Sequence, residues 1–374
     1  MKSWANYTIY MTLTIFILCY VSYDEGANFA QLIQKRQSAR ALNIADYSGS
    51  NTETSSGQQV QSAKQNIAYI HIGKTGGTSV ACLIRKAQEL YNTRQRVCER
   101  VDRSLNKLLE GNSESYISQQ VTGAYHGRKD EEYDKYALYL VTARNPIDRF
   151  ISWYLYQHPE NGYEGWNIKN YHLRPSYKVF TCYPELNQLA TYGLQTDKQK
   201  NEIYYQNLSE AQQKNETYCK RIANNCVSGR DHGCSHMHFN YQWYLNDIVH
   251  NEHKQFYVIR TEYQDYDWSI INNILGSYVN QQQYQHQQLG LKKVSHHTNR
   301  FTGKVKIRNV DNTTISQEGI RNTCRMLCKE IQTYKQLLLR AFNLKEDEKN
   351  KSIGSVASVC PIETAYNSVD QCVY

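Results

Sequence analysis

The sequence is poor in proline, with 5 among 374 residues, and its 11 cysteines are too few for a small scaffold held by disulfides alone. It also lacks a strong excess of one charge, because 43 lysines and arginines face 35 aspartates and glutamates, for a net charge of +8. Hydrophobic residues make up 40% and charged residues 21%, which excludes a disordered or collagen-like chain. The length fits one large domain or two smaller ones, and the mild basic excess suits an anionic ligand.

Charged residues are absent between Lys2 and Asp24, where the densest apolar run is Ile9–Val21. A membrane-spanning helix needs about 20 mostly apolar residues, and residues 3–23 reach that length. A lysine before the run and acidic residues after it predict a cytosolic start and a luminal body. We therefore predict a signal-anchor transmembrane helix within residues 1–23 of a single-pass type II protein. A cleaved signal peptide, which would make the protein secreted, and a buried core segment are the alternatives.

Cysteines and glycosylation motifs agree with a secretory route. Ten of the 11 cysteines lie beyond the apolar run, an even number that disulfide pairing in an oxidising lumen requires. Acceptor tripeptides for N-glycosylation begin at Asn207, Asn215, Asn312 and Asn350. These features support a luminal, disulfide-bonded glycoprotein.

The rest of the chain divides by composition. Residues 24–65 are rich in Gln, Ser, Ala, Asn and Thr without an apolar period, which predicts a flexible stem. Short apolar runs and helical patterns then alternate, with strands predicted at Ile67–Ile72, Ala137–Ala143 and Gln255–Arg260 and helices at Thr78–Tyr91 and Ile147–Tyr156. This alternation predicts a single α/β domain over residues 66–345, with a central parallel sheet flanked by helices.

The C-terminal part has apolar residues at helical spacing from Ile320 to Phe342, which predicts one amphipathic helix. Cys324 and Cys328 lie one turn apart on it and could pair with the later cysteines Cys360 and Cys372, although spacing does not fix the connectivity. We predict that residues 346–374 form a tail tethered by disulfides.

The most informative segment is YIHIGKTGGTSV, residues 69–80, in which a strand gives way to a glycine-rich turn and the start of a helix. Glycines let backbone N–H groups approach a phosphate closely, and a helix N-terminus adds unpaired donors. Lys74 supplies a mobile charge, and hydroxyls come from Thr75, Thr78 and Ser79. The alternative is an ordinary tight turn with a solvated lysine. The nucleotide-triphosphatase loop is excluded because Lys74 precedes the glycine pair instead of following it.

This segment resembles the 5′-phosphosulfate loop of sulfotransferases that use 3′-phosphoadenosine 5′-phosphosulfate (PAPS). It is most similar to the membrane-bound carbohydrate sulfotransferase family, which includes the heparan sulfate 2-O- and 6-O-sulfotransferases. The resemblance implies a P-loop-like sulfotransferase fold in which Lys74 holds the bridging oxygen and stabilises the departing phosphate. The residues that would cradle the 5′-phosphate are Thr75, Gly76, Gly77, Thr78 and Ser79.

A second motif, RNPIDRFIS at residues 144–152, resembles the 3′-phosphate segment of that family, Arg-Asp-Pro-x-x-Arg-x-x-Ser. An arginine at a strand end and a serine on the following helix can converge on one phosphate, which assigns Arg144 and Ser152 to the 3′-phosphate. Asn145 replaces the usual aspartate and can cap the following helix. In the resembling family a late basic loop closes over the nucleotide, and here it would use Lys293, Ser295 and Arg300. A solvated basic loop is the alternative.

A base that accepts the proton of the acceptor hydroxyl would assist transfer by about 10²–10⁴-fold. We predict that His126 is this base, because it follows a short possible strand and precedes a glycine in the interval between the two donor motifs. In the resembling enzymes the catalytic histidine lies in the same interval. His71 is the second choice, and a structural or exposed role for His126 is the alternative.

Residues 226–243 contain two cysteines and three histidines among aromatic and amide groups. We predict an acceptor-binding loop, in which aromatic rings stack on sugars while Arg230, His236 and His238 meet acidic groups. A zinc site made by Cys234 and the two later histidines is a weaker interpretation than a Cys226–Cys234 disulfide.

The resemblance implies a Golgi membrane enzyme that transfers a sulfuryl group from PAPS to a hydroxyl of a glycan or acidic polysaccharide. No metal and no nucleic acid partner are expected. One alternative is another nucleotide-dependent phosphotransferase, such as a kinase. The other is a catalytically silent glycan-binding relative.

Overall fold

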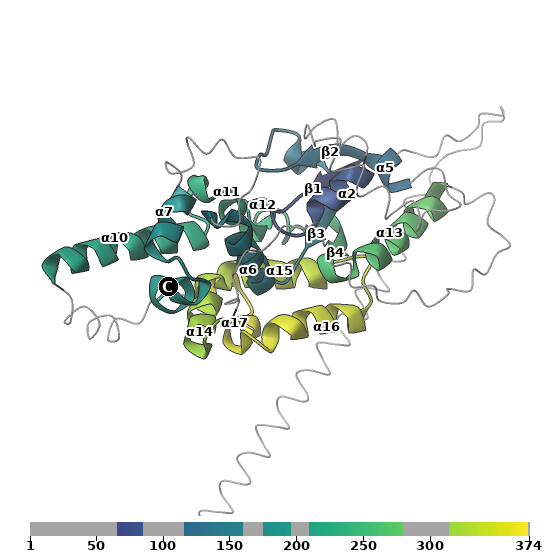
Figure 1. Cartoon of the computed structure of the whole chain (residues 1–374). Coiled ribbons are helices and arrows are strands. Elements are labelled where there is room, and N and C mark those ends of the chain that lie inside the picture. The colour runs from purple at the N-terminus through teal and green to yellow at the C-terminus, as the bar shows by residue number, and fades with distance from the viewer. Residues whose placement is uncertain (1–65, 85–115, 160–174, 196–208, 280–313, 373–374) are drawn as a thin grey trace, which may run out of the picture. The chain divides into compact units, whose positions relative to one another are not determined.

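The computed structural model describes residues 66–84, 116–159, 175–195, 209–279 and 314–372, all within one compact unit, Ser62–Tyr374 (Figure 1). The predicted anchor and stem lie outside the described residues. Among the helices that the structure describes, none has the length and apolar character needed to cross a bilayer.

The core of the domain is a four-stranded parallel sheet in the order β2-β1-β3-β4. Its strands are β1 (Ile67–Ile70), β2 (Val121–Tyr125), β3 (Leu138–Ala143) and β4 (Gln255–Arg260). All four residues of β1 are buried, as expected for a central strand covered on both faces. The predicted α/β class, the parallel sheet and the three predicted strands are therefore confirmed, and the short possible strand before His126 is β2.

The chain reverses its winding direction at β1. It passes from β1 to β2 on one side, then returns across β1 to β3 and continues to β4. In parallel sheets the connections leaving the two strands at such a switch point diverge, and a crevice opens at the carboxyl edge between them. The loops after β1 and β3 flank this crevice, and these loops carry the two motifs that are predicted to bind anions.

Helices cover both faces of the sheet, because successive strand side chains point to opposite sides. On β1, Ala68 and Ile70 join one hydrophobic cluster while Ile67 and Tyr69 join the other. The first cluster includes residues of α6 (Pro146–Gln157), α12 (Tyr241–Leu245) and α15 (Cys328–Leu339). The second includes residues of α2 (Gly77–Leu83), α5 (Tyr116–Gln120) and α13 (Gln264–Val279).

Disulfides join several of the other helical segments. Cys182 of α7 (Pro175–Cys182) is bonded to Cys219 of α10 (Glu210–Val227). Cys226 and Cys234 are bonded as predicted, and Cys82 is disulfide-bonded as well. Several short helical elements also precede the C-terminal helices described below. They are η1 (Tyr133–Lys135), α8 (Leu186–Gln188), η4 (Leu189–Gly193), η5 (His232–Cys234), α11 (Ser235–His238) and η6 (Thr261–Tyr263).

The prediction of one helix from Ile320 to Phe342 is wrong. The segment forms α14 (Gln317–Met326) and α15, with a break at Leu327. The Thr323 hydroxyl donates to the Gly319 carbonyl one turn back, a bond that tends to bend helices. The chain leaves α15 at Arg340, and Phe342, expected on the buried stripe, is 47% exposed.

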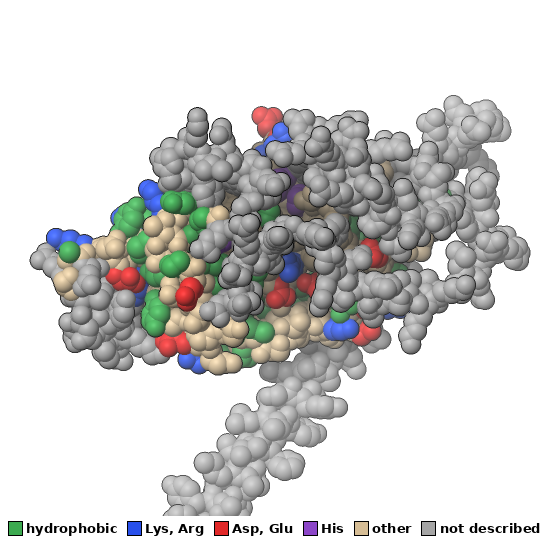
Figure 2. Space-filling model, in the orientation of Figure 1, with side chains coloured by type: hydrophobic (Ala, Val, Ile, Leu, Met, Phe, Trp, Pro, Cys, Tyr) green, Lys and Arg blue, Asp and Glu red, His purple; other side chains and the backbone are tan. Residues whose placement is uncertain are grey.

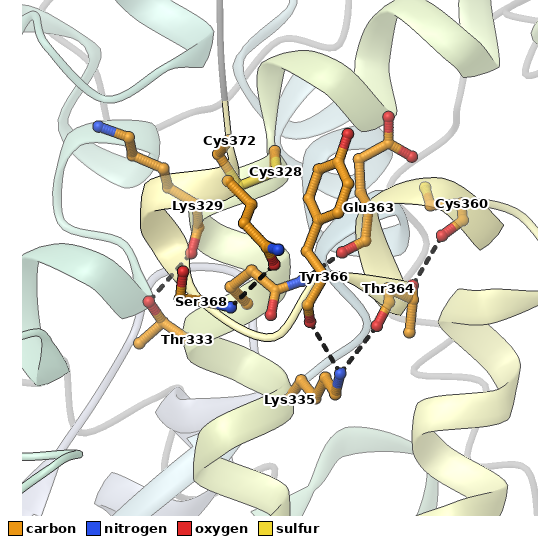
Figure 3. Close-up of a disulfide and its surroundings, with 12 residues drawn as sticks. Cys328, Lys329, Thr333, Lys335, Cys360, Glu363, Thr364, Tyr366, Ser368 and Cys372 are labelled. Atoms are coloured by element: carbon orange, nitrogen blue, oxygen red, sulfur yellow. Dashed lines mark hydrogen bonds between the residues drawn. A yellow bond between two sulfur atoms is a disulfide. The ribbon is translucent and has the colours of Figure 1, made fainter. Parts of the chain in front are cut away.

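The C-terminal segment packs along α15 (Figure 3). It comprises α16 (Glu346–Ala357), α17 (Pro361–Ala365) and η7 (Val369–Gln371). Disulfides Cys324–Cys360 and Cys328–Cys372 flank the break between α14 and α15, which confirms that these cysteines pair with one another. The Lys335 ammonium donates to the carbonyls of Thr364 and Tyr366 at 2.9 and 3.0 Å, so α15 also holds the tail by hydrogen bonds.

Candidate active site

The candidate site lies where the four strands end. Lys74 follows β1, His126 follows β2 directly, Arg144 follows β3 and Thr261 follows β4. The carboxyl ends of parallel strands share one edge of the sheet, so residues far apart in the sequence meet there. Figure 2 shows that histidine side chains reach the surface on one face of the molecule, where basic and acidic side chains are interspersed.

The loop after β1 is held in an unusual backbone conformation. Lys74 and Gly76 both have positive φ, 69° and 72°. Glycine adopts this region readily, whereas a lysine there is strained by about 1–2 kcal/mol. The Tyr69 hydroxyl fixes the loop by donating to the Gly77 carbonyl at 2.7 Å. The surrounding structure therefore imposes the position of Lys74.

Thr75 contributes to this scaffold rather than to a ligand site. Its hydroxyl donates to the Ile72 carbonyl at 2.6 Å and lies 2.7 Å from the Thr142 hydroxyl, and the residue is buried. The expectation that this hydroxyl faces a phosphate is wrong, because it is committed to the protein interior. The Ser79 amide donates to the Gly76 carbonyl at 3.1 Å, and of the two following hydroxyl residues Thr78 is exposed and Ser79 is half-buried.

The Lys74 ammonium lies 3.4 Å from the centre of the Tyr156 ring. A cation over an aromatic face is attracted by the electron density of the ring. Burial, and then the positive charge of Arg144, lower the pKa of Lys74 to about 7. An anion at this position would restore the charged form, because an opposite charge favours the ammonium.

Arg144 contacts the loop that carries Lys74. Its Nη1 makes a long 3.5 Å contact with the Lys74 carbonyl, and its Nε is buried with no hydrogen-bond partner in the described part of the chain. The Tyr241 hydroxyl fixes the Arg144 backbone by accepting from its amide at 2.6 Å and donating to its carbonyl at 2.8 Å. A buried guanidinium N–H without a partner costs stability unless a ligand satisfies it.

The helix after Arg144 begins as expected. The Asn145 side chain accepts from the Ile147 amide at 2.9 Å and caps α6, so the change from the family's aspartate preserves the capping function. Ser152 lies half-buried on this helix, two turns beyond Arg144.

Sequence reasoning missed the role of Arg149, although it stands in the same motif. Its fully buried guanidinium pairs with Glu330 of α15 through bonds of 2.5 and 2.7 Å. Nη1 also donates to the carbonyls of Gly73 and His236, at 3.4 and 2.5 Å. Arg149 therefore ties the lysine loop and the His236 segment to α15.

Three histidines gather beside the lysine loop. His126 Nδ1 lies 2.9 Å from the His71 carbonyl, and the two rings stack with centroids 4.2 Å apart. The His236 ring lies 6.3 Å from that of His126 and 5.6 Å from that of Tyr156. Burial lowers the pKa of His126, partly opposed by its hydrogen bond to His71. His71 is buried, and its ring occupies the space beside Gly77.

The segment 226–243 is not a loop, in contrast to the prediction. It consists of the end of α10, η5, α11 and the start of α12, closed by the Cys226–Cys234 disulfide and by caps from Asp231 and Asn240. The predicted residues also separate. His236 lies beside the lysine loop, whereas His238 is buried against the rings of His232, Phe239 and Trp243, and Arg230 is exposed.

The Thr-Glu pair after β4 connects the two anion motifs. The Thr261 hydroxyl lies 2.8 Å from the Thr75 carbonyl and 3.0 Å from the Ala143 carbonyl, so it links the loops after β1 and β3. Burial raises the pKa of Glu262, an effect that the nearby Arg144 opposes. The predicted nucleotide-covering residues Lys293, Ser295 and Arg300 lie outside the described residues.

A group of three side chains of metal-ligand type occurs in the described ranges, at Cys324, Cys360 and Glu363. The two cysteines are bonded to each other, so neither offers the thiolate that a metal requires. The Cys234 sulfur of the suggested zinc site is likewise committed to a disulfide.

The structure is an α/β domain with two basic residues, Lys74 and Arg144, after neighbouring parallel strands. A family model described as the sulfotransferase family matches residues 58–335, well over half of the chain. The chain therefore belongs to the sulfotransferase family and is a sulfotransferase, an enzyme that transfers a sulfuryl group. Neither curated proteins nor solved structures gave a significant match.

Proposed function

We propose that the protein transfers a sulfuryl group from PAPS to a hydroxyl of a glycan. The observation that carries this proposal is the meeting of Lys74 and Arg144 in one crevice, with Arg144 Nη1 3.5 Å from the Lys74 carbonyl. These residues belong to the two motifs that resemble the sites for the 5′-phosphosulfate and the 3′-phosphate. Their convergence at adjacent strands β1 and β3 suits a nucleotide that carries an anionic group at each end of its ribose.

The residues of the crevice fit such a donor. The buried Nε of Arg144 needs an acceptor, and a phosphate offers several oxygens to the forked guanidinium. Ser152 on α6 is the second group assigned to the 3′-phosphate. Lys74, the hydroxyls of Thr78 and Ser79, and the turn of Gly76 and Gly77 would hold the 5′-phosphosulfate. The donor would supply the activated sulfuryl group and a phosphate leaving group.

His126 suits the role of base. A carbonyl only accepts, so the contact of Nδ1 with the His71 carbonyl places the ring proton on Nδ1 and the basic lone pair on Nε2. Burial keeps the ring neutral by lowering its pKa. His126 Nε2 would take the proton of the acceptor hydroxyl as the new oxygen–sulfur bond forms. The sulfur–oxygen bond to the 5′-phosphate breaks, and its electron pair stays on the phosphate oxygen, which Lys74 stabilises.

Aromatic and basic side chains beside His126 suit a glycan acceptor. The Phe239 ring lies against Gly127, the residue after His126, and makes an edge contact with the half-exposed Trp243. Lys129 lies 5.1 Å from the Trp243 ring centre. Aromatic faces pack on sugar rings, and the cation would meet an acidic group. The disulfides agree with a luminal, Golgi location, which is part of this proposal.

The test is incubation of the full chain with radiolabelled PAPS and a panel of desulfated polysaccharides. We expect labelled polysaccharide from the wild type and none above background from Lys74→Ala. The matched control is Lys135→Ala, at an exposed lysine paired with Glu132, and it should transfer at the wild-type rate. A near-normal rate for Lys74→Ala would refute the assigned role of Lys74.

Two further measurements complete the test: turnover and nucleotide binding of the variant His126→Ala, and competition of magnesium-ATP with PAPS. His126→Ala should lose turnover and still bind adenosine 3′,5′-bisphosphate, since the ring lies outside the two donor motifs. Loss of nucleotide binding in this variant would make His126 a structural residue. Competition by magnesium-ATP would favour a kinase-like enzyme, and tight polysaccharide binding without any transfer would favour a silent relative.

A further inference from the structure

We propose that His236 is a second catalytic histidine, a neutral imidazole whose Nε2–H donates a hydrogen bond to an oxygen of the sulfuryl group during transfer. This inference rests on the proposed function and replaces the earlier prediction that His236 binds an acidic group of the acceptor. A methyl group at Gly73 would lie 2.5 Å from Cδ2 of His236 and 3.1 Å from its Cγ, so the ring packs directly on the lysine loop, and Cδ2 is the carbon bonded to Nε2.

A chain of hydrogen bonds determines which nitrogen of His236 carries the proton. The indole N–H of Trp153 can only donate, and it donates to Gln157 Oε1 at 2.7 Å. The Gln157 amide nitrogen therefore faces His236 Nδ1, at 3.1 Å, and donates to it. Nδ1 is thus an acceptor and the proton of the neutral ring lies on Nε2. No hydrogen bond is made by His236 Nε2 to any residue in the described ranges, so it remains able to donate to a ligand.

His126 and His236 consequently have opposite tautomers. His126 is protonated on Nδ1 and presents a basic Nε2, whereas His236 accepts at Nδ1 and presents an N–H. Their ring centroids are 6.3 Å apart, and both rings lie beside the loop that carries Lys74. The two rings, 6.3 Å apart, would thus have complementary roles. His126 would remove the proton of the acceptor hydroxyl, and His236 would stabilise the negative charge on the sulfuryl group during transfer.

The surroundings keep His236 neutral, so it donates without giving up its proton. Burial, followed by electrostatic interactions with Lys74, His126 and Arg149, lowers its pKa to about 3. The backbone is fixed as well, because Arg149 donates to the His236 carbonyl at 2.5 Å. A donor that is already oriented requires no rearrangement as charge develops, which is the condition under which such groups accelerate a reaction most.

The tautomers can be read directly from the full chain labelled with ¹⁵N-histidine. Nitrogen–proton correlation spectra should show His236 protonated on Nε2 and His126 protonated on Nδ1, with both resonances assigned by substitution. The exposed His253 serves as the reference resonance. A His236 resonance with its proton on Nδ1 would overturn the inference.

The catalytic role is tested with His236→Leu, which removes the donor, and His236→Gln, whose amide N–H can take the place of Nε2–H. With labelled PAPS and the best polysaccharide, His236→Leu should lower kcat by about 10²–10³-fold, the usual loss for one such donor. KM for the acceptor and affinity for adenosine 3′,5′-bisphosphate should stay unchanged. His236→Gln should recover about tenfold of the lost kcat, and the control His253→Leu should match the wild type.

Three results would overturn the inference. Equal kcat in His236→Leu and His236→Gln would show that the donor is irrelevant. A rise in acceptor KM alone would restore the acceptor-binding role, and lost bisphosphate binding would make the ring a support for the lysine loop. These results all require an active wild type, so they differ from failure of the proposed function, in which the wild-type chain itself moves no label from PAPS and the inference fails with it.

Discussion

Replacing Glu330 with glutamine would test whether the buried ion pair supports both the fold and the site. The Arg149 and Glu330 side chains are 0% and 3% exposed and are joined by two hydrogen bonds, of 2.5 and 2.7 Å. Glutamine keeps the shape but leaves a buried guanidinium without its counter-charge. Removing one partner of such a pair costs about 3–5 kcal/mol, whereas removing a partner at the surface costs about 1 kcal/mol or less.

The measurement is unfolding of the full chain in urea, followed by the fluorescence of the tryptophans, which include the fully buried Trp153. Glu330→Gln should lose about 3 kcal/mol or more of the free energy of unfolding. The matched control is Glu346→Gln, at the exposed end of the Lys349–Glu346 pair, where the glutamate is 54% exposed. An equal loss in the two variants would refute the reasoning, because the loss would then not depend on burial.

A double variant separates stability from function. Arg149→Met with Glu330→Met replaces both charges by apolar groups, and such replacements usually regain much of the lost stability. Transfer activity should remain low, because the carbonyls of Gly73 and His236 lose their shared donor. Recovery of both properties would show that Arg149 does not position the site.

Three further outcomes are expected. Arg144→Ala should weaken the binding free energy of adenosine 3′,5′-bisphosphate by about 1.5–3 kcal/mol, as measured by titration calorimetry. The binding free energy of adenosine 5′-monophosphate should stay nearly unchanged. Equal losses for both nucleotides would show that Arg144 does not bind the 3′-phosphate. Binding of the bisphosphate should be strongest below pH 7 and weaken as the pH rises above it. The reason is that free Lys74 has its pKa lowered to about 7 and the bound anion raises it; Lys74→Arg should abolish this slope, and a slope that persists would assign it to another group. Cys328→Ser, which opens a bond spanning 44 residues, should lower the free energy of unfolding by about 2–4 kcal/mol, and a change below about 1 kcal/mol in urea unfolding would contradict this.

The sheet and the positions of the two motifs at its edge were predictable because their determinants are local. Buried parallel strands are short apolar runs, and β1, β3 and β4 each show one. Lys74 lies in the turn after β1, and Arg144 follows β3 directly. Because neighbouring parallel strands end at one edge, placing the motifs on adjacent strands was enough to bring them together.

Features that depend on distant contacts could not be predicted. Arg149 and Glu330 are 181 residues apart, and nothing in either segment identifies the other as its partner. His236 and His238 lie two residues apart and seemed equivalent in the sequence. On the short helix α11 a separation of two residues turns side chains to different sides, so only His236 meets the lysine loop. The break at Leu327 was hidden because the apolar stripe continues through it.

The hydroxyl of Thr261 holds two segments of the candidate active site at a fixed spacing. A single oxygen atom on the last strand of the sheet lies within hydrogen-bonding distance of the carbonyls of Thr75 and Ala143, which belong to the two loops that carry the cationic groups. The interval between those loops therefore depends on a residue to which no ligand contact is assigned. A substitution at Thr261 would therefore change the spacing between Lys74 and Arg144 while leaving both cationic groups in place.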